Sequence, residues 1–273
     1  AYALDVVTYN VSAILAPAIV AAVAGIVSPL VSLLMLSVLM IGASIMVLRV
    51  PIERQGDRAV IIPPSPVDGI KAIARVVPLR TTVVATSCSS IGNGILPVAA
   101  TVLAMNTFSV NAGIMLSTMA VGALIGSLAY AARPFGTEAP HRLVPFISLA
   151  IAIPVALIAM TSSTILALAL FALAGFLGGP QGAAQFSVRD RFSPPNVRTQ
   201  VFTLSTSVKT TAAAIGAAVA GIISGASPAL LLAIAVVANI IGGVSAIADL
   251  RAHGWMQPDV DAEAAIPDAE IPA

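Results

Sequence analysis

The sequence predicts an all-α membrane protein with eight transmembrane helices. Hydrophobic side chains make up 58% of the 273 residues and charged ones only 9%, whereas a soluble domain carries about 25% charged residues. The charges leave four long uncharged segments, which are residues 6–48, 81–132, 143–188 and 210–248. One bilayer-spanning helix needs about 20 apolar residues, so each segment is long enough for two. A membrane β-barrel is excluded, because its strands would form short segments of alternating polarity.

A turn signal near the middle of each uncharged segment divides it into a helical hairpin. These signals are Ser28-Pro29, Met105–Thr107, Thr161–Thr164 and Ser224–Pro228. We therefore expect helices at about residues 6–27, 30–48, 81–104, 111–132, 143–161, 164–187, 200–224 and 229–248. The acidic, proline-interrupted residues 251–273 are too polar to pack and are expected to form a disordered tail.

The basic residues predict the orientation of these helices. Twelve of the 13 Lys and Arg residues lie in the segments between hairpins or in the tail, and the four tight turns carry none. The positive-inside rule places loop 49–80 and the C-terminus in the cytoplasm, so we expect a multi-pass protein of the cytoplasmic (inner) membrane. The basic loop would also suit a surface that binds lipid head groups.

An internal repeat relates the first and seventh predicted helices. Residues 16–28 and 212–224 are identical at ten of 13 positions, and each copy is followed by a proline, Pro29 or Pro228. Helices rich in Ala, Val and Gly also match one another by chance composition. A true repeat would place equivalent helices six apart with the same direction, which is how one fold of transporters is built.

Two short motifs connect this pattern with a known family. Gly126, Leu128 and Ala129 match the loop motif G-x-L-a-D-R-x-G-R, with Tyr130 in place of the Asp, and Pro17 is the single match to the exporter motif G-P-x-x-G-G. With these motifs, the repeat and the long basic loop, the chain resembles the major facilitator superfamily. That resemblance implies two six-helix halves around a central cavity.

The resemblance also implies a domain organisation. The eight helices correspond to family helices five to twelve, so four further helices are expected before residue 1. Residues 1–48 would then be the last two helices of the N-terminal half, residues 49–80 the cytoplasmic linker, and residues 81–250 the six-helix C-terminal half. The whole would be a partial major-facilitator fold, followed by the tail 251–273.

Polar side chains within the apolar helices are candidates for binding a substrate. Lys209 is the only cation inside an apolar helix, and its alternative role is to extend its ammonium to the head groups. Gln181 and Gln185 share one helix face, and the resemblance implies that the third and sixth helices line the cavity. Hydrogen bonding between helices is the alternative for these polar groups. The substrate-binding candidates are Asn93, Ser89, Ser90, Gln181, Gln185, Lys209 and Thr206.

Charged residues at the ends of the predicted helices are expected to be loop charges that set the topology, with a gating ion pair as the alternative. This group contains Arg133, Arg142, Arg189, Asp190 and Arg191. Together with the two motif residues, the gating or loop candidates are Gly126, Arg133, Pro17 and Asp190.

The resemblance implies a secondary active transporter that moves a small molecule by alternating access, and general similarity indicates an exporter of the drug-efflux kind. The alternative is a non-transporting membrane sensor or assembly partner derived from a truncated transporter. No catalytic motif is found, so we expect no enzyme, cofactor or metal. Besides the substrate, the expected partner is the lipid bilayer and not a nucleic acid, and the intact protein is expected to be a monomer.

A proton is the candidate coupling ion. A proton-coupled transporter needs a titrating group inside the membrane, and such groups are usually acidic. Asp5 and Asp249 lie at the ends of predicted helices. We therefore expect the coupling carboxylate in the helices before residue 1, with Lys209 facing that carboxylate or an anionic group of the substrate.

Overall fold

The structure is a computed structural model that describes residues 29–49, 65–108, 110–225 and 227–253. The chain forms two compact units, of which one spans residues 11–63 and the other contains residues 64–273. In the first unit, α2 (Pro29–Leu48) is an apolar helix of 20 residues, as predicted for residues 30–48. Outside the described residues lie the predicted helix 6–27 with Pro17, residues 50–64 of loop 49–80, and the tail beyond residue 253.

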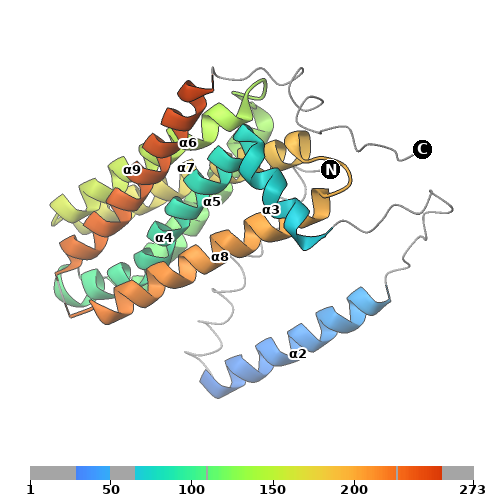
Figure 1. Cartoon of the computed structure of the whole chain (residues 1–273). Helices are drawn as coiled ribbons and strands as arrows, with labels where there is room; N and C mark the ends of the chain where they lie inside the picture. Colours follow the sequence, from blue (N-terminus) through green and yellow to red (C-terminus); the bar gives the residue numbers. More distant parts are fainter. Residues whose placement is uncertain (1–28, 50–64, 109, 226, 254–273) are drawn as a thin grey trace, which may run out of the picture. The chain divides into compact units, whose positions relative to one another are not determined.

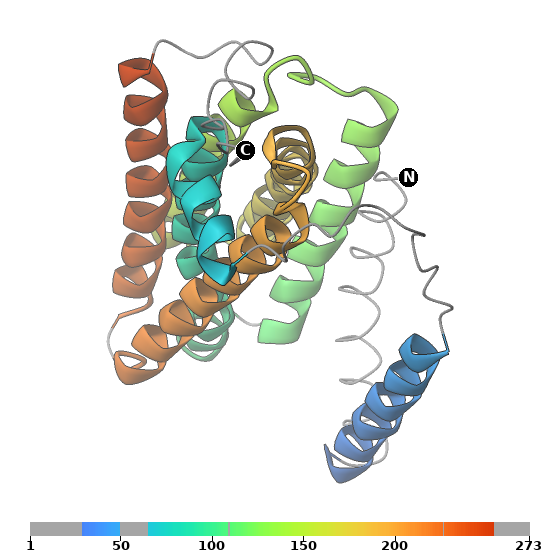
Figure 2. The same cartoon turned by 45° about the vertical axis from the view of Figure 1, so that its right-hand side comes forward.

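The second unit is a bundle of long helices with one short helix beside it (Figure 1). Its elements are α3 (Pro66–Arg75), α4 (Val77–Asn106), α5 (Ala112–Ala132), α6 (Pro140–Met160), α7 (Thr164–Phe192), α8 (Arg198–Ile222) and α9 (Pro228–Ala252). In Figure 2, α9 and α5 stand on opposite sides of the bundle and α8 crosses it obliquely. α4 packs against α9, α8 and α6, while α7 packs against α5 and α6. The described residues contain no β-strand.

The predicted all-α membrane architecture is confirmed for this bundle. Five of its helices, α4, α5, α6, α7 and α9, are long and apolar enough to cross a membrane. α8 is also 25 residues long, but its first half is rich in Thr, Ser and Gln, which lowers its hydropathy. The predicted bounds agree to within a few residues. The helices extend furthest beyond them at one end of the bundle, where α4 begins and α7 and α9 end. We call it the basic end because it carries Arg80, Arg133, Arg142, Arg191, Arg198 and Arg251.

The short helix α3 lies within residues 49–80, which the sequence predicts to be a loop. A capping box starts it, because Ser65 Oγ accepts a hydrogen bond from the backbone of Val67 while Asp68 Oδ2 accepts one from Ser65 N at 2.9 Å. The backbone N–H of Gly69 then donates to Gln200 Oε1 on α8 at 3.0 Å. α3 is therefore attached to the beginning of α8 by a hydrogen bond.

Glycines allow two pairs of helices to approach until their backbones touch. Gly122 and Gly126 on α5 lie against the backbone of α7, and Gly175 and Gly179 on α7 lie against the backbone of α5, so each helix contributes a G-x-x-x-G motif. A Cβ on Gly126 would lie 2.0 Å from the carbonyl oxygen of Phe176, where no side chain fits. Small residues at such spacing are a common basis of helix association in membranes. The α5–α7 contact therefore depends on these four glycines.

Glycines also allow the backbones of α4 and α8 to touch. A Cβ on Gly94 would lie 2.0 Å from the carbonyl oxygen of Ala213, and one on Gly216 would lie 2.1 Å from that of Ile91. α8 is therefore held against α4 through its Ala- and Gly-rich second half. Its polar first half continues toward the basic end.

The largest apolar cluster occupies the half of the bundle away from the basic end. It joins Ile95 of α4, Met115 of α5, Val155 of α6, Phe171 of α7 and Leu231 of α9, all of them buried. Polar side chains are concentrated in the remaining half, between this cluster and the basic end. The fold thus separates an apolar packing layer from a polar layer.

Candidate functional site

A cavity of about 170 Å³ lies within the polar layer. Its wall is formed by α4, α5, α6, α7 and α8, with the apolar side chains of Leu96, Met119 and Ile151 on one part. Six of the seven predicted substrate-binding residues also line it, namely Ser89, Ser90, Asn93, Gln181, Gln185 and Lys209. The structure therefore brings together side chains from α4, α7 and α8 that are far apart in the sequence. That they bind a substrate stays a prediction.

A buried hydrogen-bond network forms one side of this cavity. Ser89 Oγ donates to Asn239 Oδ1 on α9 at 2.8 Å, and Gln181 Nε2 donates to Ser148 Oγ on α6 at 2.8 Å. Gln181 Nε2 also lies 3.3 Å from Ser89 Oγ. All four side chains are buried, where an unpaired polar group would be costly. The network thus satisfies these groups and connects four helices.

Ser148 and Asn239 are members of this network that sequence reasoning missed. Each lies in an apolar segment, and neither has a polar side chain three or four residues away that would mark its face. Their rarity in such segments was the available signal, because polar side chains inside membrane helices usually have a partner.

Two other predicted residues on α4 differ in exposure. Ser90 Oγ donates to the carbonyl oxygen of Thr86 at 2.8 Å, one turn earlier in the same helix, so its hydrogen is used locally. Asn93 lines the cavity and is exposed. Among the polar side chains of α4 that line the cavity, Asn93 is therefore the exposed one.

Two cations meet at the end of the cavity nearest the basic end. Lys209 Nζ lies 3.4 Å from Gln185 Oε1, and Arg189 Nη2 lies 3.5 Å from the same oxygen. Arg189 Nη1 also donates to Thr206 Oγ1 at 3.3 Å, and the guanidinium lies over the ring of Phe186. Lys209 thus contacts a side chain of α7 within the bundle, which favours the cavity over the head groups as its place.

Three of the predicted loop charges, Arg142, Asp190 and Arg191, lie in the end turns of α6 and α7 instead of in loops. The interpretation of Arg189 as a loop charge is wrong as well. The residue belongs to the last turn of α7, which continues to Phe192, and its side chain is only 2% exposed. α7 is longer than predicted because the first strong stop signal after it is Pro194-Pro195, and a proline disfavours helix in the residue before it. The first charged residue after the apolar segment therefore does not mark the end of α7.

The remaining predicted residues lie outside the cavity lining. Thr206 is one turn from Lys209 and bonds Arg189. Gly126 lies inside α5 at the contact with α7. Arg133 is exposed at the end of α5, and Asp190, in the last turn of α7, forms an ion pair with Arg198 at the start of α8. A gating role for any of them stays a prediction.

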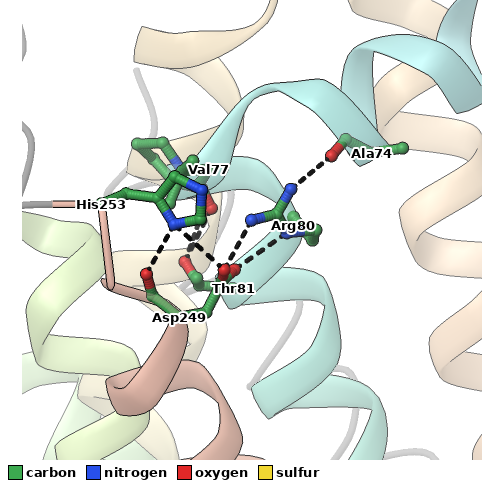
Figure 3. A network of polar contacts seen from close by, with 7 residues as sticks. Ala74, Val77, Arg80, Thr81, Asp249 and His253 are labelled. Carbon is green, nitrogen blue, oxygen red and sulfur yellow. Dashed lines mark hydrogen bonds and ion pairs between the residues drawn. The ribbon is translucent and has the colours of Figure 1, made fainter. Parts of the chain in front are cut away.

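A further ion pair joins α4 to α9 at the basic end. Figure 3 shows the Asp249 carboxylate between the Arg80 guanidinium and the His253 ring. Arg80 donates from Nε to Asp249 Oδ2 at 2.8 Å and from Nη2 to Oδ1 at 2.5 Å. Arg80 Nη1 donates to the carbonyl oxygen of Ala74 in α3 at 2.7 Å. The fork of the guanidinium therefore links three helices at one point.

Residues 1–217 match the model of one protein family, the Major Facilitator Superfamily. The chain belongs to the major facilitator superfamily. This confirms the resemblance and identifies the chain as a polytopic membrane transporter acting on a small molecule. Comparison with curated proteins and with solved structures gives no match. The match to the superfamily ends within α8, but α9 packs against α4 and α6 in the same bundle.

Proposed function

We propose that the protein is a secondary active transporter that carries its substrate across the cytoplasmic membrane by alternating access, in the direction of export, as in drug efflux. The observation that supports this proposal is the cavity in the polar layer. In an otherwise apolar bundle, it gathers hydroxyl, amide and ammonium groups from three helices. Polar groups inside a membrane protein are costly to keep and usually mark a pathway for a substrate or an ion.

The orientation belongs to the same proposal. The basic end, with Arg80, Arg142 and Arg251 among its residues, would face the cytoplasm under the positive-inside rule. The C-terminus after α9 would then be cytoplasmic as well. Export itself rests on the match of Pro17 to the exporter motif and on general similarity, and Pro17 lies outside the described residues.

Coupling to protons would require a carboxylate elsewhere in the protein. In the described helices α4 to α9, the acidic residues are Asp190 and Asp249, and both lie near the basic end. The titrating group would therefore lie outside these described helices, as expected from the sequence. The C-terminal bundle would supply the substrate site and fixed positive charge.

Cysteine accessibility tests alternating access without knowledge of the substrate. In the protein made from its whole reading frame, with native cysteines such as Cys88 replaced by serine, Asn93→Cys places a thiol in the cavity. A transporter that alternates exposes this thiol to both sides of the membrane in turn. A membrane-impermeant maleimide should therefore label it in both right-side-out and inside-out vesicles.

Two control positions make the labelling interpretable. Ser162→Cys in the α6–α7 turn should react from the outside alone, and Lys71→Cys in α3 should react from the cytoplasmic side alone; both positions are exposed. Reaction of Asn93→Cys from one side alone would contradict alternating access and favour the non-transporting sensor or assembly partner. Reversed labelling of the two controls would contradict the orientation.

A further inference from the structure

We propose that the cavity binds an oxyanion, a carboxylate or phosphonate group of the transported molecule, at the end where Lys209 lies with Arg189 behind it. The inference rests on the proposed function and names the class of its substrate. It starts from two positive charges that share one neutral acceptor, Gln185 Oε1, at 3.4 and 3.5 Å. The amide oxygen has two lone pairs and can accept from both cations, but it is uncharged and neutralises neither.

The two cations have no carboxylate partner among the described residues. The ion pairs of the described bundle that involve Asp68, Asp190 and Asp249 use other basic residues, namely Lys71, Arg198, Arg80 and His253. Arg189 is 2% exposed, and its Nε is buried without a hydrogen-bond partner among those residues. Buried charges are normally paired, so this arrangement is incomplete as it stands.

The surroundings of Arg189 hold the guanidinium in place without neutralising it. Thr206 Oγ1 accepts from Nη1 at 3.3 Å, and the guanidinium carbon lies 5.8 Å from the centre of the Phe186 ring. A hydroxyl and an aromatic face orient a cation but leave its charge available. Lys209 and Gln185 line the cavity, and Gln185 joins Arg189 to it. An oxyanion at this end of the cavity would meet an ammonium directly and a guanidinium behind it.

The rest of the lining indicates the shape of the bound molecule. Ser89, Ser90 and Asn93 present polar groups further along the cavity, and Leu96, Met119 and Ile151 present an apolar wall. The ligand chemistry that fits is a small organic anion with an apolar body, rather than an inorganic ion.

A second source of the oxyanion is a carboxylate of the protein itself, from residues outside the described ones. The two sources predict opposite effects of removing a cation. If a ligand supplies the oxyanion, the ligand-free protein carries an uncompensated positive charge. Replacing one of the two cations by a neutral residue should then stabilise the folded protein, as happens when binding sites are neutralised. If an internal carboxylate completes the site, removing one cation leaves that carboxylate unpaired and destabilises the protein.

The variant that tests the site most sharply is Gln185→Glu. It keeps the size of the side chain and places a carboxylate at the atom that both cations contact. In the purified protein from the whole reading frame, this variant should have a higher apparent melting temperature than the wild type in chloride buffer. Lys209→Gln and Arg189→Gln should do the same to a smaller extent, and Lys71→Gln, at the one other lysine of the chain, should change nothing.

Binding is measured with benzoate and methylphosphonate, with benzamide as the neutral match and ionic strength held constant with NaCl. At least one anion should give a saturable rise in the melting temperature of the wild type and of Lys71→Gln, while benzamide gives none. The half-saturating concentration should increase about tenfold or more in Lys209→Gln and Arg189→Gln, which is about 1.4 kcal/mol. Gln185→Glu should abolish the response, and Lys209→Arg should keep part of it.

Three results would overturn the inference: no saturable response to either anion, an unchanged response in Lys209→Gln, or lower stability of all three neutralising variants in chloride. The outcome is independent of the cysteine test. Labelling of Asn93→Cys from both sides without an anion response would leave the transporter proposal intact and remove the anion site. An anion response together with labelling from one side alone would leave the anion site intact and contradict alternating access.

Discussion

Replacing Gly175 in α7 by alanine should weaken the α5–α7 contact. A Cβ at Gly175 would lie 1.9 Å from the carbonyl oxygen of Met119 and 3.0 Å from the amide nitrogen of Ala123. Both are backbone atoms, so no side chain can rotate away. To bring the shorter contact to the 3.4 Å at which ordinary packing begins, the two helices must separate locally by about 1.5 Å.

The magnitude follows from the kind of contact that is lost. Overpacking of a close interface costs about 1–3 kcal/mol when neighbours can adjust, and this interface repeats the same backbone contact at Gly122, Gly126 and Gly179. Separation at Gly175 therefore also opens the next turn. We expect about 2–3 kcal/mol of destabilisation, at the upper part of that range.

The matched control is Gly178→Ala, three residues along the same helix, because its Cβ would meet nothing within 4 Å. The assay is reversible unfolding of the whole protein in mixed micelles with increasing sodium dodecyl sulfate, followed by circular dichroism. Gly178→Ala should be neutral or slightly stabilising, since alanine favours a helix over glycine. Equal unfolding midpoints for Gly175→Ala and Gly178→Ala would refute the packing argument.

The other predictions concern the ion pair, the buried network and the topology. Asp249→Asn breaks the forked ion pair with Arg80 and should destabilise the protein by about 1 kcal/mol in the same unfolding assay. Lys71→Ala removes a more exposed ion pair, with Asp68, and should have no measurable effect. Equal unfolding midpoints for the two variants would contradict this. Asn239→Leu should cost about 0.6–1.7 kcal/mol, as membrane hydrogen bonds do, and a stabilised variant would show that the network is not needed for packing. Alkaline phosphatase fused after residue 162 should be active outside the cytoplasm, and an inactive fusion with normal expression would contradict the orientation.

The helices could be predicted from the sequence because their main determinant is local. Uncharged segments of about 20 apolar residues need no knowledge of neighbours, and α5, predicted at 111–132, begins at Ala112 and ends at Ala132. α3 escaped prediction because its capping signals at Ser65 and Asp68 lie in a charged segment that was interpreted as linker. The local signals there indicate a helix, whereas the charged composition of the segment is typical of a linker.

The candidate site was predictable in part for a different reason. Gln181, Gln185 and Lys209 stand out because polar side chains are rare in apolar helices, and all three line the cavity. Arg189 was missed because a charge near a helix end is ordinarily outside the membrane. Its contact with Thr206 of α8 comes from packing between helices, which the spacing along one helix does not reveal.

The arrangement of the helices connects the packing to the site. α8 packs mainly against α4, through Gly94 and Gly216, whereas α7 packs mainly against α5 and α6. The two helices that carry the cations are therefore fixed to different partners. Beside the cavity, α7 and α8 are joined by the side-chain contacts from Lys209 to Gln185 and from Arg189 to Thr206. The stacked rings of Phe186 and Phe202 and the Asp190–Arg198 ion pair also connect these two helices. A bound oxyanion would add a further connection at the cavity. A movement of α8 with α4 relative to α7 would then alter the site and its affinity together, which is the coupling that alternating access requires.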